Sequence, residues 1–180
     1  MKRLSYILML VSVVLFASCS DELDTAPSDK VAAVDLFKDV ESASAVINGV
    51  YRMMYYSGWS QNWAPENAGQ VSVTLVANLM ADDHIMRSAG SGWYYYDYAF
   101  DTRQDYLHRS GHQYGFWNLY YTMISNINAI LHYEQELAGD EKQIKNLMAQ
   151  AYAMRAFAYH QLVQIFSTPV NANPDAPGIP

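Results

Sequence analysis

An aromatic stretch at residues 90–98, Gly-Ser-Gly-Trp-Tyr-Tyr-Tyr-Asp-Tyr, holds the side chains best suited to ligand binding in this 180-residue chain. A sugar ring has an apolar C–H face. Laying that face on an aromatic ring removes apolar surface from water, while nearby amides and carboxylates bind the hydroxyls. Trp93 is the first candidate, because the glycines before it free it to project, and Tyr94 and Tyr96 follow it. The alternative is that these rings divide between core and surface, with half of them only packing against helices.

Polar residues before this stretch are candidates for the same site. Asp82, Asp83 and Arg87 could bind sugar hydroxyls, although a solvated loop with local turn hydrogen bonds is the favoured interpretation. A second set of loop residues that could meet a ligand comprises Trp59, Asn62 and Trp63.

Enzyme and metal readings find little support. Glycoside hydrolysis needs two carboxylates about 5–10 Å apart across a cleft, whereas the side chains of the adjacent Asp82 and Asp83 diverge. His108 and His112 have the spacing of two metal ligands on a helix, but a serine and a glycine lie between them and no third ligand is evident. No Gly-x-Ser-x-Gly motif occurs. The sequence therefore indicates no catalytic, metal or cofactor site, and it predicts exposed loop positions for the two histidines.

Two helical runs between Phe116 and Phe166 must provide the scaffold. Apolar residues recur at spacings of three and four, which places them on one face of each helix. In the first run they are Phe116, Tyr120, Met123, Ile127, Ile130, Leu131 and Leu137. In the second run they are Ile144, Leu147, Met148, Ala151, Met154, Ala158, Leu162 and Ile165. This pattern predicts an antiparallel helical hairpin.

Small and polar residues of the hairpin allow more specific predictions. Gly139 suits the end of the first helix, and Asp140 suits the N-cap of the second. Three alanines would let a neighbouring helix approach closely, namely Ala149, Ala153 and Ala156. Arg155 is expected to pair with a helix-end carbonyl or a carboxylate rather than to act in chemistry.

The segments before the hairpin follow the same rules. A helix that includes Ala43 to Met54 is expected, with Asp39 or Ser42 as its cap, and Gly49 inside it suggests close packing. Three further segments lie between this helix and the hairpin. Residues 71–80 are apolar and fit either a helix or a strand. Residues 90–98 are the aromatic stretch, which the flanking glycines place on a loop, and residues 101–115 are polar and lead into the hairpin.

Composition excludes some classes of protein. Apolar residues make up 51% of the chain and charged residues 16%, which indicates a folded domain with a core rather than a disordered chain. The net charge is −7, and the lysines and arginines form no basic stripe. A nucleic-acid partner bound through its phosphates is therefore not expected.

The first residues read as an export signal. Lys2 and Arg3 precede an apolar run from Leu4 to Phe16, which is shorter than the roughly 20 residues needed to cross a membrane. Cys19 follows small residues, in the position of the lipidated cysteine of a bacterial lipobox. We expect residues 1–18 to be a lipoprotein signal peptide and residues 19–30 to be a lipidated acidic tether.

Three segments together resemble the N-terminal part of the SusD/RagB family, the nutrient-uptake lipoproteins of Bacteroidetes. They are the lipidated start with residues 45–51 (Ala-Val-Ile-Asn-Gly-Val-Tyr), residues 117–131 from Trp117 to Leu131, and residues 149–159 with the closing Pro-Gly-Ile-Pro. The resemblance implies an all-α, tetratricopeptide-like helical stack with long irregular loops, of which residues 31–180 would be the front part in a longer protein. The sequence departs from the family pattern at residues 166–169 (Phe-Ser-Thr-Pro), where family members usually have a glycine before the proline.

The resemblance also implies a function. Family members bind oligosaccharides, sometimes peptides, and are not catalysts. The implied partner is a SusC-like TonB-dependent barrel, and the implied location is the outer membrane, with a surface-exposed lipid anchor. The rival expectation is a helical protein-interaction module, or a peptide-uptake lipoprotein, that binds no glycan.

Overall fold

The computed structural model describes residues 36–57, 68–81, 83–88, 90, 92–99 and 111–180. The helices in these ranges are α3 (Val40–Met53), α4 (Gln70–Met80), α5 (Tyr95–Ala99), α6 (Gly111–His132) and α7 (Glu141–Phe166). The same ranges contain no strand, and an isolated parallel bridge joins Asp39 to Ala138. The all-α prediction is confirmed, and the apolar segment at 71–80 that fitted either state is a helix.

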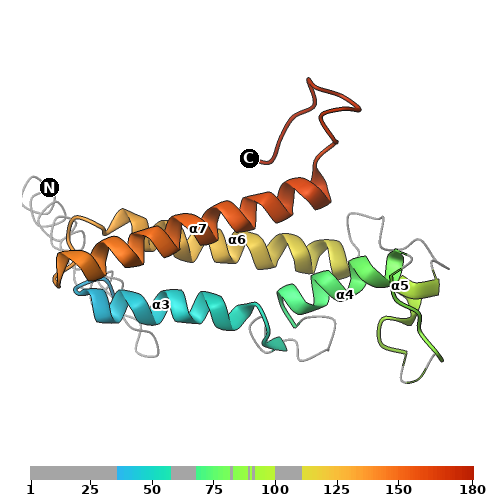
Figure 1. Ribbon diagram of the computed structural model, residues 1–180, viewed down its shortest axis with the longest axis horizontal. Coiled ribbons are helices and arrows are strands. Elements are labelled where there is room, and N and C mark those ends of the chain that lie inside the picture. The colour runs from blue at the N-terminus through green and yellow to red at the C-terminus, as the bar shows by residue number, and fades with distance from the viewer. Residues whose placement is uncertain (1–35, 58–67, 82, 89, 91, 100–110) are drawn as a thin grey trace, which may run out of the picture. The chain divides into compact units, whose positions relative to one another are not determined.

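Helices α6 and α7 form the predicted antiparallel hairpin and lie side by side (Figure 1). The buried face of α6 consists of Leu119, Tyr120, Met123, Ile124, Ile127 and Ile130. The buried face of α7 consists of Leu147, Met148, Ala151, Met154, Ala158 and Leu162. These positions repeat every three or four residues, so each helix turns one apolar stripe toward the other. Within the described residues no helix is long and apolar enough to pass through a membrane.

Helix α3 completes the core by packing against both helices of the hairpin. Its first turn is capped by Asp39, whose Oδ1 accepts a hydrogen bond of 2.7 Å from the Ser42 amide, so the first of the two candidate caps is the correct one. The suggestion that Gly49 marks close packing is wrong. A Cβ at Gly49 would have no neighbour within 4 Å, because this side of α3 faces solvent.

The connection between α6 and α7 differs from the sequence expectation. Helix α6 ends at His132, before Leu137, which is nevertheless buried in the connection. Two backbone hydrogen bonds then join Ala138 to the start of α3, from the Val40 amide (2.9 Å) and to the Lys38 carbonyl (3.0 Å). Gly139 therefore serves a close approach and does not end the helix. It has φ 147°, and a Cβ there would lie 2.6 Å from Val40 Cγ1.

The three alanines predicted to face a neighbouring helix lie on the solvent side of α7. Ala149, Ala153 and Ala156 are exposed, whereas Ala151 and Ala158 are fully buried. Successive residues of a helix are rotated by about 100°, so residues two apart point in nearly opposite directions. Ala149 and Ala153 therefore point away from the buried Ala151, and Ala156 points away from the buried Ala158. The small side chains that contact the core belong to the second set.

Polar side chains join α4 to the hairpin. The Tyr120 hydroxyl donates to Gln70 Oε1 (2.7 Å) and, more weakly, to Gln161 Oε1 (3.5 Å). The Gln70 amide nitrogen donates to Gln161 Oε1 (3.4 Å), so one residue from each of α4, α6 and α7 takes part. Burial raises the pKa of Tyr120 well above its ordinary value, so the phenol stays protonated as the donor.

Candidate functional site

Trp93 lies on a sharply turned segment between α4 and α5, and its side chain is 47% exposed. The turn needs backbone that most residues avoid: Gly90 and Gly92 have φ of 52° and 92°, and Tyr94 has φ of 60°. A positive φ at a tyrosine is costly and persists only where the surroundings hold it. The turn therefore presents Trp93 in a defined position.

A side-chain contact stabilises this backbone conformation at Tyr94. The Tyr94 hydroxyl lies 3.0 Å from Ser72 Oγ, and Ser72 is fully buried in α4. Ser72 Oγ also accepts a hydrogen bond of 2.8 Å from the Ala68 amide, just before α4. Tyr94 thus links the turn to α4, while the neighbouring Trp93 is exposed.

The prediction of a loop throughout 90–98 is wrong at its C-terminal end. Residues Tyr95–Ala99 form the short helix α5. The Tyr95 amide bonds to the Gly92 carbonyl (3.1 Å) and the Tyr98 amide to the Tyr94 carbonyl (3.2 Å), which closes helical turns immediately after the glycines. Asp97 on α5 is 3% exposed, so its carboxylate is not at the surface.

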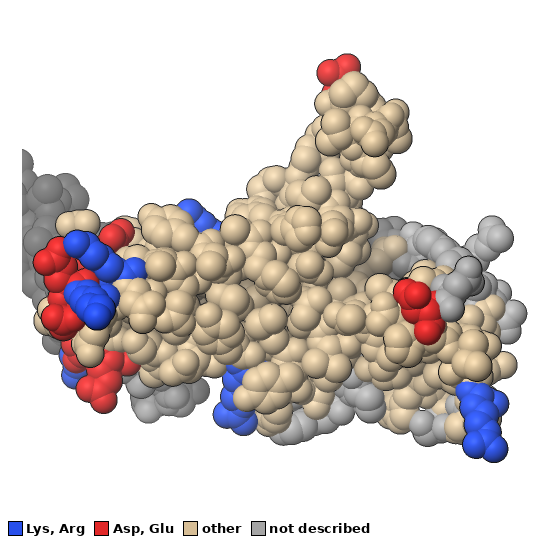
Figure 2. Space-filling model, in the orientation of Figure 1, with Lys and Arg blue, Asp and Glu red and all other residues tan. Residues whose placement is uncertain are grey.

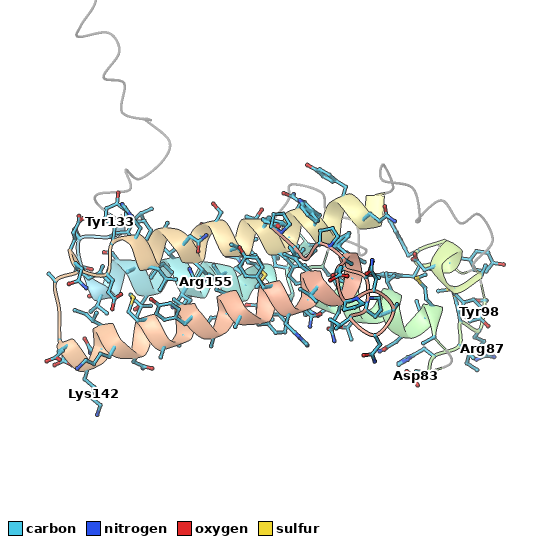
Figure 3. All side chains as sticks on the ribbon, turned by 90° about the horizontal axis from the view of Figure 1, so that it is seen from above. Asp83, Arg87, Tyr98, Tyr133, Lys142 and Arg155 are labelled. Carbon is cyan, nitrogen blue, oxygen red and sulfur yellow. The ribbon has the colours of Figure 1, made fainter. Side chains whose placement is uncertain are left out.

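The charged candidates lie at the same end as α4 and α5. Asp83 and Arg87 are exposed, and Figure 3 labels both at the end of the helical part that also carries Tyr98. Asp82 and the side chain of Tyr96 lie outside the described residues, as do Trp59, Asn62, Trp63, His108 and Cys19. The loop prediction for His112 is wrong, because α6 begins at Gly111 and includes it.

Arg155 contacts neither a helix-end carbonyl nor a carboxylate among the described residues. Its Nη1 donates to Asn128 Oδ1 on α6 (3.0 Å), and its guanidinium lies 5.2 Å from the centre of the Tyr152 ring. This arginine therefore links α7 to α6. In the part of the chain that the structure describes, no group of three histidine, cysteine or acidic residues is placed to hold a metal ion.

A second aromatic surface, which sequence reasoning missed, lies where α6 begins and α7 ends. A pocket of about 280 Å³ is lined by Gln113, Tyr114, Trp117 and Phe166. Trp117 is 39% exposed, and its ring meets Phe166 edge-on with centroids 5.2 Å apart. It also packs against Tyr121 at 4.6 Å. The aromatic residues 114, 117 and 121 recur at helical spacing and so share one side of α6, and Tyr121 also packs against the core.

The helical hairpin, the flanking helix and the exposed rings define an all-α scaffold with aromatic side chains at its surface, and sequence comparison gives its family. The chain belongs to the SusD-like family, whose model, described as "Starch-binding associating with outer membrane", matches residues 38–180. It is also 27% identical over 164 residues to SusD-like protein P2 of Formosa agariphila. That match covers 91% of this chain and 29% of the relative, so the chain spans under a third of the relative's length. No solved structure gives a significant match.

Proposed function

We propose that this chain is part of a lipoprotein that captures oligosaccharide at the outer-membrane surface and passes it to a TonB-dependent transporter. The family described above is one of starch-binding proteins associated with the outer membrane, which supports the ligand class and the location. Lipidation at Cys19 and delivery to a SusC-like barrel follow from the resemblance of the sequence. Catalysis is no part of the proposal.

The observation that carries the proposal is the exposed Trp93 on a turn held by Tyr94 and Ser72. A ring that is already fixed binds a sugar face with little further loss of conformational entropy. Trp117 offers a second ring beside the Gln113 amide, so stacking and a hydrogen bond to a hydroxyl come from adjacent residues there. Asp83 and Arg87 would add polar contacts at the rim of the first site.

Affinity electrophoresis tests both rings. We expect Trp93→Ala to migrate faster than the native chain through a gel that contains amylopectin, because the stacking surface is lost. Trp93→Phe keeps a ring and should keep part of the retardation. Trp117→Ala reports on the second surface alone.

Ile85→Ala is the matched control, because Ile85 is 86% exposed, apolar and not aromatic. Its mobility should equal that of the native chain. If a polysaccharide retards the native chain and both tryptophan variants equally, the exposed rings are not the site. Copurification with a barrel in detergent, without retardation by any polysaccharide tested, would favour the protein-interaction rival.

A further inference from the structure

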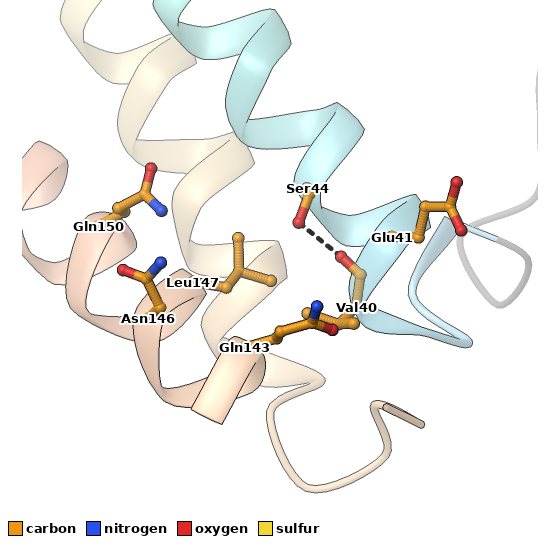
Figure 4. A pocket seen from close by; sticks show the side chains of 7 residues that line it. All are labelled: Val40, Glu41, Ser44, Gln143, Asn146, Leu147 and Gln150. Carbon is orange, nitrogen blue, oxygen red and sulfur yellow. Dashed lines mark hydrogen bonds between the residues drawn. The ribbon is translucent and has the colours of Figure 1, made fainter. Parts of the chain in front are cut away.

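A polar groove lies between α3 and α7, where both helices begin. It has a volume of about 370 Å³ and is lined by Val40, Glu41, Ser44, Gln143, Asn146, Leu147 and Gln150. Figure 4 shows the Asn146 and Gln150 amides next to one another along α7, with Ser44 on the facing helix. Val40 and Leu147 are buried and form an apolar floor.

The walls of this groove are fixed before any ligand arrives. The bridge between Asp39 and Ala138 joins the start of α3 to the connection that leads into α7. Asp140 Oδ2 accepts from the Gln143 amide (3.1 Å) and sets the first turn of α7. A ligand therefore meets a groove whose width is already set, which lowers the entropic cost of binding.

The lining groups match a peptide backbone better than a sugar. Each amide side chain carries one acceptor and two donors and can pair with both polar groups of a peptide unit. Ser44 donates its hydrogen to the Val40 carbonyl (2.6 Å), so its oxygen faces a ligand as an acceptor. Among the described residues, no aromatic ring lines the groove, so these residues offer no surface on which a sugar ring could stack.

The spacing of the amides agrees with this assignment. Gln143, Asn146 and Gln150 occupy positions i, i+3 and i+7 of α7, which span about 10 Å along the helix. Three residues of an extended chain also span about 10 Å. The three side-chain amides therefore match about three successive peptide units. Gln150 Oε1 also accepts a weak hydrogen bond from the Tyr51 hydroxyl on α3 (3.4 Å), so Gln150 offers a ligand chiefly its amide hydrogens.

The acidic residues around the groove favour peptides that carry a positive charge. Glu41 lines the groove, and among the described residues around the starts of α3 and α7 carboxylates outnumber ammonium groups; Figure 2 shows both kinds gathered there. The charged residues here are Lys38, Asp39, Glu41, Glu134, Glu136, Asp140, Glu141, Lys142 and Lys145. We propose that this groove binds an extended polypeptide segment with a lysine or arginine beside Glu41, as a site separate from the aromatic surfaces.

Fluorescence anisotropy with defined peptides tests the proposal. The probe is a fluorescein-labelled hexapeptide of alternating alanine and lysine, measured on the native chain. We expect the native chain to bind the peptide saturably. The double variant Asn146→Ala/Gln150→Ala should bind it about tenfold more weakly, because two hydrogen-bonding amides are lost. Glu41→Gln should weaken binding several-fold and flatten its dependence on salt.

Three controls make the result specific. Gln164→Ala removes an exposed amide of the same helix outside the groove and should change nothing. A hexapeptide N-methylated on its alanines keeps the charge but loses backbone donors, and should bind at least about tenfold more weakly. Circular dichroism checks that each variant keeps its helix content.

Four results would overturn the assignment: no binding of the lysine peptide by the native chain, unchanged binding in the double variant, equal binding of the N-methylated peptide, or displacement of the peptide by maltohexaose. The last result would make the groove a sugar site. None of them bears on the tryptophan rings, whose test uses polysaccharide and other variants.

Discussion

Asp39 and Asp140 have the same role at the starts of α3 and α7. Each carboxylate accepts a hydrogen bond from the backbone amide three residues later, Ser42 in one case and Gln143 in the other. The first turn of a helix leaves amides without partners, and a carboxylate there also meets the positive end of the helix dipole. Because the backbone bridge holds these two starts together, the caps fix the position of both walls of the groove.

The cap at Asp39 predicts a dependence of stability on pH. The hydrogen bond from the Ser42 backbone amide is the main reason that the pKa of Asp39 lies below its ordinary value of 3.8. A folded-state pKa that is lowered means stability that is fully present above the ordinary pKa and lost as the pH falls through the lowered one. Asp39→Asn keeps a capping oxygen without the charge, so we expect its Tm to lie below that of the native chain at pH 7. The two Tm values should converge near pH 2, where the native cap is also neutral.

Thermal unfolding followed by circular dichroism between pH 2 and pH 7 measures this difference. Glu41→Gln is a useful control, because it removes a neighbouring charge but not the cap. A difference in Tm between Asp39→Asn and the native chain that stays constant down to pH 2 would show that the cap charge does not stabilise the fold.

The two capping aspartates could be predicted from the sequence, because helix capping depends only on residues close together in the chain. An aspartate three residues before an amide it can cap is visible in a single stretch, and so is the apolar stripe of a helix. The roles of Gly139 and of Ala149 were not predictable, since they depend on where α3 lies and on which side of α7 faces solvent. Trp117 was missed for the same reason: whether a ring on a helix is exposed depends on what packs beside it.

At the scale of the elements, the junction between α3 and α4 requires one particular glycine. Gly69 has φ 63°, and the Val71 amide after it bonds to the Met54 carbonyl (3.2 Å). A Cβ at Gly69 would overlap the Met53 backbone carbonyl and lie 2.6 Å from the Met54 carbonyl carbon. Both atoms belong to the backbone, so no side-chain rotation relieves the clash.

Two identical substitutions should therefore have opposite effects on stability. Gly69→Ala should lower the free energy of unfolding by more than about 1 kcal/mol, because its backbone conformation and the space around it both exclude a side chain. Gly49→Ala, in the middle of α3 with no atom near its added methyl, should raise it by about 0.5–1 kcal/mol. Urea unfolding at equilibrium measures both. Changes of the same sign would contradict this account of the junction.

At the scale of the whole helical part, residues 36–180, the buried side chains form one cluster that unites α3, α6 and α7. Helix α4 contributes Val73 to that cluster, while its other buried apolar residues, Val76 and Leu79, lie outside it. Helix α5 packs against α4. The region that carries Trp93 is thus attached to the core through few buried residues and the Tyr120–Gln70 hydrogen bond.

This arrangement predicts two levels of protection against amide hydrogen exchange. Amides of α6 and α7 should exchange only on global unfolding, whereas amides of α4 and α5 should exchange through a local opening of lower free energy. Ile127→Ala removes a fully buried side chain of the main cluster and should lower the free energy of global unfolding by about 2–4 kcal/mol. Protection of α6 and α7 should fall by that amount, while protection of α5 stays the same.

Val76→Ala is the reciprocal variant, since Val76 is buried in α4 outside the main cluster. It should reduce protection in α4 and α5 and leave α6 and α7 unchanged. If Ile127→Ala lowers protection in α5 and in α7 equally, the helices unfold as one unit. The turn that presents Trp93 would then be as rigid as the core, and a ligand could not reshape it without unfolding the scaffold. Separate protection would mean that sugar binding at Trp93 stabilises α4 and α5 without changing the core.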